Sequence, residues 1–186
     1  FRYDVRLLNP EGRSLPIGSE GEIIARGPSM FLGYTNRAET DKAVDEEGFF
    51  HTGDLGRIAE NGTITVTGRI KDLIIRGGEN LSAKEIEDAL SQHPSIADLA
   101  VVGAPHERLG EGVAAFIVRT EGCALPDTAA VGRFLSDAGL APQKWPEFIF
   151  EIEALPRTAS GKVQKHLLRA EAKTRLRKFD GAECNQ

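Results

Sequence analysis

The stretch from Thr67 to Glu87 constrains the fold of this chain more than any other segment. It reads TGRIKDLIIRGGENLSAKEIE and joins an apolar strand, a charged joint, a glycine pair and a capped helix. Gly77 and Gly78 favour a turn or a close backbone approach, because glycine adopts positive φ without steric cost. Ser82 and Glu85 have the spacing of a capping box, which predicts that a helix begins there. Few folds need these elements in this order.

The composition is that of an ordinary globular protein and excludes several classes of function. The chain has 186 residues, enough for one domain or for one domain and part of another. Hydrophobic residues make up 40% and charged residues 27%. The net charge of -5 argues against general affinity for nucleic acids, because phosphate binding requires a basic surface. No apolar run approaches the length of a membrane span, and no signal peptide opens the chain.

The cysteines and histidines predict neither a metal site nor a disulfide framework. Cys123 and Cys184 lack the spacing of a zinc or redox pair, and the four histidines lack metal-ligand spacing. We interpret the cysteines as bystander thiols in a reducing compartment, which predicts a cytoplasmic location. The chain opens inside a strand-like run, residues 1–8, so we interpret it as a fragment or a processed product.

The hydrophobic pattern predicts an α+β fold in two parts. The first part is rich in strands and turns, with Asn61-Gly62 as a hairpin signal. In the second part strands and helices interleave. The expected strands are residues 3–8, 22–26, 55–59, 63–67, 99–102, 112–119 and 148–152, and the expected helices are residues 39–44, 82–93, 131–138 and 167–177, with Pro94 ending the second helix. The boundary between the two parts falls near residues 69–72.

A first chemical motif is GFFHTGDLG, residues 48–56. An aspartate between a glycine turn and a hairpin can present two carboxylate oxygens to two vicinal hydroxyls, which is the arrangement that a ribose offers. Asp54 is therefore a candidate ribose ligand. Taken alone, the same residue fits an aspartate that caps a turn.

A second motif follows at residues 69–78. Arg69 can donate a pair of hydrogen bonds to a ribose or a phosphate, and Lys71 and Asp72 follow where the strand ends. The Gly77-Gly78 pair then permits close backbone approach to a ligand. By itself this motif also fits a charged surface loop with a glycine turn.

A third motif, LPRTASGKVQK, covers residues 155–165 and contains Lys162. A lysine in such a loop can stabilise negative charge that develops on phosphate oxygens. The motif is not the phosphate-binding loop of nucleotide hydrolases, because Pro156 stands where that loop needs glycine and Val163 where it needs Ser or Thr. An exposed basic turn that leads into a basic helix is the alternative.

Together, and in this order, the three motifs resemble the late motifs of the adenylate-forming superfamily, which comprises acyl-CoA synthetases, luciferases and peptide-synthetase adenylation domains. Upstream, Gly33-Tyr34, Glu39-Thr40 and residues 45–48 extend the resemblance, and residues 107–116, which read ERLGEGVAAF, extend it between the second and third motifs. The likeness covers roughly residues 3–172. It implies that residues 1–70 are the β-rich end of a large N-terminal AMP-binding domain and that residues 71–186 are a small, mobile C-terminal α+β domain.

The resemblance also implies a role for each site residue. Asp54 would hold the ribose hydroxyls of ATP and of the acyl-adenylate, Arg69 would make a second nucleotide contact, and Val66 would line the adenine pocket. Lys71 would be the hinge between the domains. Lys162 would be the catalytic residue of adenylation, and Gly77 and Gly78 would adjoin the pantetheine of CoA.

The implied activity is that of an ATP-dependent acid–thiol ligase, an acyl-CoA synthetase of fatty-acid or related carboxylate metabolism that works by domain alternation. ATP and CoA would be its co-substrates, and Mg²⁺ would be held by an N-terminal domain outside this chain, so the fragment alone is expected to be inactive. Lys162 acetylation would cancel the charge of this lysine. Leu109 departs from the aromatic residue of many CoA ligases, which weakens any inference about stacking with the adenine of CoA.

Two alternatives remain at this point. An adenylation enzyme could load a carrier protein instead of CoA, although no carrier domain or attachment serine follows the Lys162 motif. The chain could also be a non-catalytic module that retains a nucleotide- or CoA-binding surface. The acid that is activated cannot be read from these residues.

Overall fold

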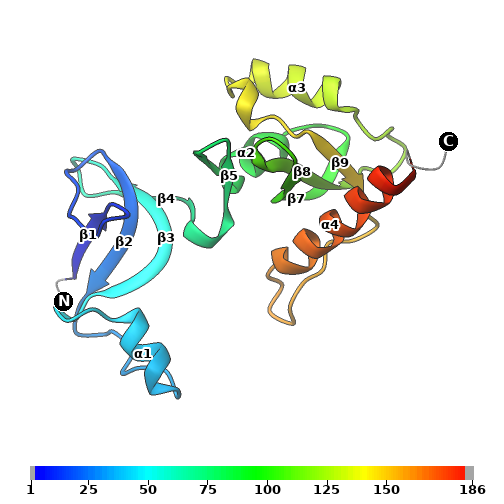
Figure 1. Cartoon of the computed structure of the whole chain (residues 1–186). Helices are drawn as coiled ribbons and strands as arrows, with labels where there is room; N and C mark the ends of the chain where they lie inside the picture. The colour runs from blue at the N-terminus through cyan, green and yellow to red at the C-terminus, as the bar shows by residue number, and fades with distance from the viewer. Residues whose placement is uncertain (1–2, 183–186) are drawn as a thin grey trace. The chain divides into compact units, whose positions relative to one another are not determined.

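The computed structural model describes the backbone of residues 3–182 and the side chains of residues 3–177. The chain divides into two compact units, one ending at Lys71 and the other beginning at Asp72 (Figure 1). Both strands and helices are present, so the predicted α+β class is confirmed.

The first unit is an antiparallel sheet with one short helix. The strands are arranged in the order β1-β2-β3-β4, and each pairs with its neighbour in the sequence. Their bounds are β1 Asp4–Leu8, β2 Glu20–Arg26, β3 Phe50–Ile58 and β4 Ile64–Arg69, with α1 Arg37–Ala43 between β2 and β3. Leu8, Ile24 and Phe49 form the buried cluster of this unit.

The predicted hairpin between β3 and β4 is confirmed, with one difference in its turn. The Gly62 amide donates to the Ala59 carbonyl at 2.8 Å, and the Ala59 amide donates to the Thr63 carbonyl at 2.9 Å. Gly62 adopts φ +81°, whereas Asn61 does not have positive φ. The turn therefore needs only its glycine in the left-handed region.

The second unit is a mixed sheet with helices on both faces. The strand order is β6-β5-β8-β7, and β9 pairs with β8 in parallel. The elements are η1 Ile70–Asp72 at the boundary, then β5 Leu73–Arg76, β6 Glu79–Ser82, α2 Ala83–Leu90, β7 Ile96–His106, β8 Gly110–Arg119, α3 Thr128–Asp137, η2 Pro142–Lys144, β9 Phe148–Glu151 and α4 Lys165–Ala182.

The long β7–β8 pair has a separate hydrophobic core on each face. On one face, side chains from α2 and α3 pack against Val113, Ala115 and Ile117. On the other face, Leu168 and Ala172 of α4 pack against a second set that includes Phe116. Figure 1 shows α4 and α3 on different sides of these strands. Burial on both faces explains the nearly continuous apolar runs of β7 and β8.

Several elements differ from the prediction, and the clearest differences in boundaries concern α2 and β7. Ser82 caps α2 as expected, because its hydroxyl accepts a hydrogen bond from the Glu85 amide at 3.3 Å. However, α2 ends at Leu90 rather than at His93. The strand β7 also extends well beyond residues 99–102, because it pairs with β8 from Ile96 to His106. The sequence pattern identified only its continuously apolar centre.

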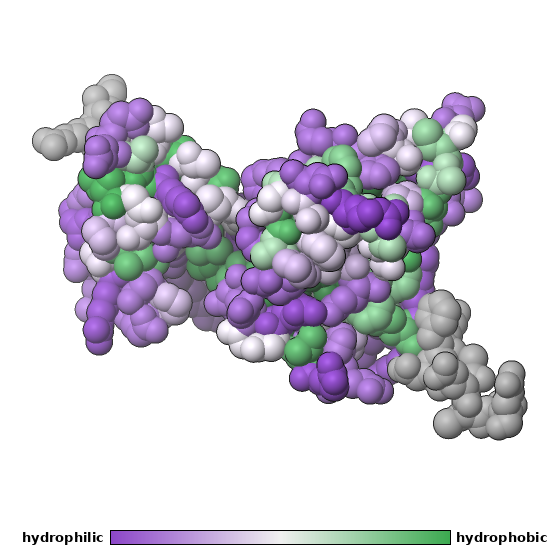
Figure 2. Space-filling view, turned by 90° about the horizontal axis from the view of Figure 1, so that it is seen from above, coloured by the Kyte–Doolittle hydropathy of each residue, from purple (hydrophilic) through white to green (hydrophobic). Residues whose placement is uncertain are grey.

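One face of the molecule is mainly hydrophilic (Figure 2). In the face shown in Figure 2, hydrophobic residues form scattered patches among charged and polar ones. Among the described residues, every helix is too short or too polar to cross a membrane.

Candidate functional site

Asp54 and Arg69 lie opposite each other on neighbouring strands. They are register partners in the β3–β4 pair, and Arg69 Nε donates to Asp54 Oδ1 at 2.6 Å. The side chains are 27% and 47% exposed, respectively, so both remain accessible to a ligand. The structure thus brings together two residues that the sequence motifs placed in separate segments.

A bulge in β3 sets the position of Asp54. Glu22 of β2 pairs with Leu55 and Ile24 pairs with His51, so residues 52–54 of β3 lie opposite Ile23 alone. Gly53 in this bulge adopts φ +67°, which a side chain would disfavour. Such bulges interrupt the regular alternation of a strand and re-aim a side chain, and they recur next to active sites.

Side chains that the motif did not include stabilise the bulge. Glu22 Oε1 accepts from the Gly53 amide at 3.2 Å, and Glu22 Oε2 lies 3.0 Å from His51 Nδ1. The other ring nitrogen, His51 Nε2, lies 3.7 Å from Asp45 Oδ2. Sequence reasoning missed Glu22, because it lies about 30 positions from the motif and has no local signature there. Only the strand pairing brings it close.

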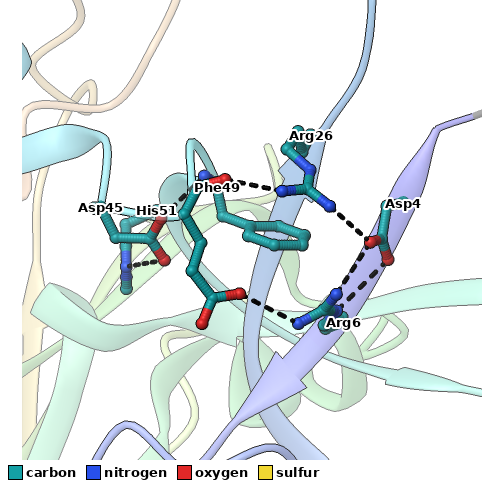
Figure 3. Close-up of polar contacts among 7 residues, drawn as sticks. Asp4, Arg6, Arg26, Asp45, Phe49 and His51 are labelled. Carbon is teal, nitrogen blue, oxygen red and sulfur yellow. Dashed lines mark hydrogen bonds and ion pairs between the residues drawn. The ribbon is translucent and has the colours of Figure 1, made fainter.

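Two arginines hold Phe49 at the start of the Asp54 motif (Figure 3). The guanidinium carbons of Arg6 and Arg26 lie 4.3 and 4.4 Å from the centroid of its ring, and the ring is fully buried. Asp4 accepts from Arg6 Nη2 at 3.0 Å, and this hydrogen bond lowers the pKa of the Asp4 carboxyl. Cation–π contacts and ion pairs therefore hold in place the residue that precedes β3.

Val66 and Lys71 occupy the end of the first unit. Val66 lies on β4 opposite Gly56, and it is 47% exposed although it is apolar. An exposed valine on the same strand as Arg69 is available to contact a ligand. Lys71 is exposed and lies in η1, between the last strand of one unit and the first strand of the other.

Gly77 and Gly78 form the two-residue turn between β5 and β6. Their φ angles are +59° and +89°, and Arg76 pairs with Glu79 on either side of them. Two consecutive positive φ values are typical of a type I′ hairpin turn. A Cβ at Gly78 would meet no atom within 4 Å, so this position is open to an approaching molecule.

Lys162 lies in a hairpin-like loop whose hydrogen bonds are largely internal. The Thr158 amide donates to the Lys162 carbonyl at 2.8 Å, and the Lys162 amide donates to Thr158 Oγ1 at 3.1 Å. Arg157 closes the loop by donating to the Gly161 carbonyl, and it also binds Asp98 Oδ2 at 2.7 Å. Lys162 itself is exposed, so its ammonium group can meet an anion.

Ion pairs connect the helix after this loop to the rest of the second unit. Lys165 Nζ lies 2.8 Å from Glu87 Oε1, which also accepts from the Val101 amide at 2.7 Å. Arg169 donates to Asp72 Oδ1 at 2.8 Å. The start of α4 is therefore attached both to α2 and β7 and to the residue that follows Lys71.

The predicted site residues thus form three separate groups. Asp54, Arg69 and Val66 belong to the first unit. In the second unit, the β5–β6 turn and the loop that precedes α4 lie apart from each other (Figure 1). Among residues whose side chains the structure describes, no group of three or more His, Cys, Asp or Glu could hold a metal ion.

Comparison with known proteins identifies the family. Residues 85–162 match the model of the AMP-binding enzyme C-terminal domain. The chain is 46% identical to the medium-chain fatty-acid–CoA ligase of Escherichia coli over 174 residues, which are 93% of this chain and 31% of the ligase. The chain belongs to the adenylate-forming enzymes. It spans about a third of the length of the curated relatives that it matches.

Other relatives share this family but have names that indicate different activities. Triostin synthetase I of Streptomyces triostinicus is also 46% identical, over 90% of this chain and 32% of the synthetase. Among solved structures, ATP-bound MatB from Rhodopseudomonas palustris matches with a TM-score of 0.83 and 42% identity, over 92% of this chain and 34% of MatB. The predicted family and fold are therefore confirmed, whereas the roles of single residues stay predictions.

Proposed function

We propose that this chain is the C-terminal part of an ATP-dependent carboxylic acid–CoA ligase. The enzyme would convert an acid and ATP to acyl-AMP and pyrophosphate, and then convert acyl-AMP and CoA to acyl-CoA and AMP. One observation carries the proposal: Asp54 and Arg69 meet at 2.6 Å in a chain that resembles a CoA ligase over 93% of its length.

In this proposal the Asp54–Arg69 pair binds the nucleotide. The Asp54 carboxylate has an oxygen for each of the two ribose hydroxyls, and Arg69 lies beside it as a donor to ribose or phosphate. Val66 covers one face of the adenine. The bulge at residues 52–54 supports this assignment, since it turns Asp54 out of the regular strand pattern.

Lys162 promotes the first half-reaction. A carboxylate is a poor electrophile until it acquires a good leaving group, and transfer of AMP to it supplies one. The substrate carboxylate and the triphosphate repel each other, and negative charge builds on the α-phosphate in the transition state. An ammonium group at this point favours both the approach and the transition state, without any covalent bond to the lysine.

Gly77 and Gly78 serve the second half-reaction. The thiol of CoA has to reach the carbonyl carbon of the acyl-adenylate, the centre that Lys162 faced before. Rotation about Lys71 would present the Lys162 loop in the first step and the glycine turn in the second. The separation of these two loops within the second unit supports such an exchange (Figure 1).

Several parts of the reaction belong to the rest of the enzyme. We assign the choice of acid and the binding of Mg²⁺ to a larger N-terminal domain, since the described residues of this chain offer no cluster of metal ligands. This chain alone is therefore expected not to complete the reaction. A cytoplasmic location and regulation by acetylation of the exposed Lys162 are further parts of the proposal.

The decisive experiment separates the two half-reactions in the full-length enzyme. Lys162→Ala should slow adenylation, measured by pyrophosphate exchange, by about 100- to 1000-fold. It should leave thioester formation from supplied acyl-AMP near the unmodified rate. Lys84→Ala is a matched control, because Lys84 is a surface lysine paired with Asp88 on α2. Equal loss of both half-reactions would contradict the role given to Lys162.

A second candidate function replaces CoA by a carrier protein. Its support is that Triostin synthetase I is as similar to this chain as the fatty-acid–CoA ligase is. Supplying the full-length enzyme with CoA or with a pantetheinylated carrier protein would distinguish the two acceptors. If neither accepts an acyl group, calorimetry of this chain with ATP, AMP and CoA would test whether it is a binding module only.

A further inference from the structure

The Gly77–Gly78 hairpin is attached to the rest of its sheet by few main-chain bonds. β5 pairs with β6 at four positions, but it pairs with β8 only between Arg76 and Gly110. One further bond joins the Gly77 amide to the Leu109 carbonyl at 2.8 Å. Ile74 and Leu81 anchor the base of the hairpin in the core. The turn itself therefore depends on other contacts for its position.

The first such contact comes from Glu111 on β8. Its Oε2 atom accepts from the Ile75 amide at 2.8 Å, where a main-chain carbonyl would accept in a regular sheet. The carboxylate occupies the space above Gly103, since a Cβ built there would lie 2.7 Å from it. Glycine at position 103 thus makes room for this carboxylate.

The second contact comes from Glu147, immediately before β9. Its Oε1 atom accepts from Arg76 Nε at 3.2 Å and from Arg76 Nη2 at 2.6 Å. Its Oε2 atom accepts from the Val113 amide at 3.1 Å, and its own amide donates to the Val113 carbonyl at 2.9 Å. Here Gly112 makes room, because a Cβ at that position would overlap Glu147 Oε2.

Glu147 therefore fills a gap in the sheet. Along one edge of β8, β5 pairs at Gly110 and β9 pairs from Ala114 onward. Between them, Glu147 satisfies the main-chain groups of Val113, which would otherwise lack partners. The same carboxylate binds Arg76, the residue next to Gly77. The Glu147 side chain therefore links β8 to Arg76, the residue that precedes the glycine turn.

We propose that Glu147, assisted by Glu111, is a positioning residue that holds the Gly77–Gly78 turn in place for the thiol-transfer step. The part of this inference that concerns the thiol rests on the proposed function, whereas the contact with the turn does not. The Glu147 and Arg76 side chains are 25% and 22% exposed, so their charge-assisted hydrogen bonds are partly shielded from water. Charge-assisted bonds of this kind are the stronger class of protein hydrogen bond.

A matched control lies at the other end of β9. Glu151 of β9 binds Arg119 Nε at 2.8 Å, but this pair is 49% and 43% exposed and does not involve β5. Glu147→Gln and Glu151→Gln therefore remove the same charge from two glutamate–arginine pairs, of which only one adjoins the turn.

The first measurement is hydrogen–deuterium exchange in the full-length enzyme, followed on the peptide that spans residues 73–79. Glu147→Gln should speed its exchange about tenfold, because the turn loses an interaction with a charged group. Glu151→Gln should leave the exchange unchanged. Equal exchange in Glu147→Gln and in the unmodified enzyme would overturn the proposal, whatever reaction the enzyme performs.

The second measurement compares the two half-reactions. Glu147→Gln should slow thioester formation from supplied acyl-AMP by about 10- to 100-fold, as expected when a contact surface is misplaced, and should leave pyrophosphate exchange unchanged. A purely structural role would slow both, and that result would overturn the positioning role. If the unmodified enzyme forms no thioester with CoA, the proposed function fails, and the exchange measurement still decides whether Glu147 holds the turn.

Arg76→Gln provides an independent variant, in case Glu147→Gln does not fold. This variant removes the contact between Arg76 and Glu147 by changing the residue next to the turn, and it leaves the hydrogen bonds between Glu147 and Val113 in place. It should reproduce both effects, and the double variant should lose no more than either single variant, because the two residues act through one contact. Additive losses would overturn the inference that they act together.

Discussion

Asp54→Asn should weaken nucleotide binding strongly while it lowers the stability of the fold only slightly. The pair of Asp54 and Arg69 is short, at 2.6 Å, but Arg69 is 47% exposed. Exposed pairs are screened by solvent and contribute roughly 0.2–1 kcal/mol to stability. The substitution should therefore lower the melting temperature of this unit by only a few degrees.

The expected effect on binding is larger. Under the proposed function, the Asp54 carboxylate accepts a hydrogen bond from each ribose hydroxyl of AMP. Hydrogen bonds to charged groups contribute about 1.5–3 kcal/mol each, and asparagine retains only one acceptor oxygen. A loss of about 2 kcal/mol corresponds to roughly 30-fold weaker binding of AMP.

The assay is calorimetric titration of the full-length enzyme with AMP and with 2′,3′-dideoxy-AMP. The unmodified enzyme should prefer AMP, and Asp54→Asn should bind the two nucleotides almost equally. Glu20→Gln is the control, because Glu20 makes a 2.9 Å cross-strand pair with Arg57 in the same sheet and this pair involves neither Asp54 nor Arg69. If Asp54→Asn weakens the binding of both nucleotides by the same factor, then Asp54 does not bind the ribose hydroxyls and the reasoning is wrong.

Three further predictions concern the hinge and the first unit. Lys71→Pro should impair one half-reaction more than the other, because proline fixes φ at the boundary between the units; unchanged rates of both would remove the hinge assignment. Phe49→Ala should destabilise the first unit by about 3–5 kcal/mol in urea unfolding, because Phe49 is only 1% exposed and two arginines pack on it. Since Arg6 lowers the pKa of Asp4 below 3.8, the Asp4 charge stabilises the fold above that pH, and this contribution is lost as the pH falls toward the lowered value. Asp4→Asn should therefore lower the free energy of unfolding at pH 7 but change it little at strongly acidic pH. An equal loss at both pH values would contradict a lowered pKa for Asp4.

Sequence reasoning succeeded where the signal is local. The hairpin turn at Gly62 and the cap at Ser82 depend on interactions within a few residues, and both occur where they were predicted. Helix α1 likewise forms close to its expected position. Such features depend on backbone preferences that a short segment carries with it.

The errors arise where distant segments decide the structure. The polar residues at the ends of β7 belong to the strand because β8 pairs with them, and no pattern within β7 indicates this. For the candidate site, the motifs identified Asp54 and Arg69 but not their mutual contact. Glu22 and Glu147 remained hidden for the same reason, since each acts on a backbone segment far from it in the sequence.

The β7–β8 pair, with a core on each face, has a mechanical consequence. Both candidate loops are attached to this pair. The glycine hairpin pairs with β8, and the helix that follows the Lys162 loop packs on the face of the pair that lies away from α2 and α3. A strand pair that is buried on both faces resists bending, so it connects the two loops rigidly. Under the proposed function, a turn at Lys71 would then move both loops together, and bringing one loop to the reaction centre would withdraw the other. Such an arrangement would keep the two steps in strict alternation without a separate signal.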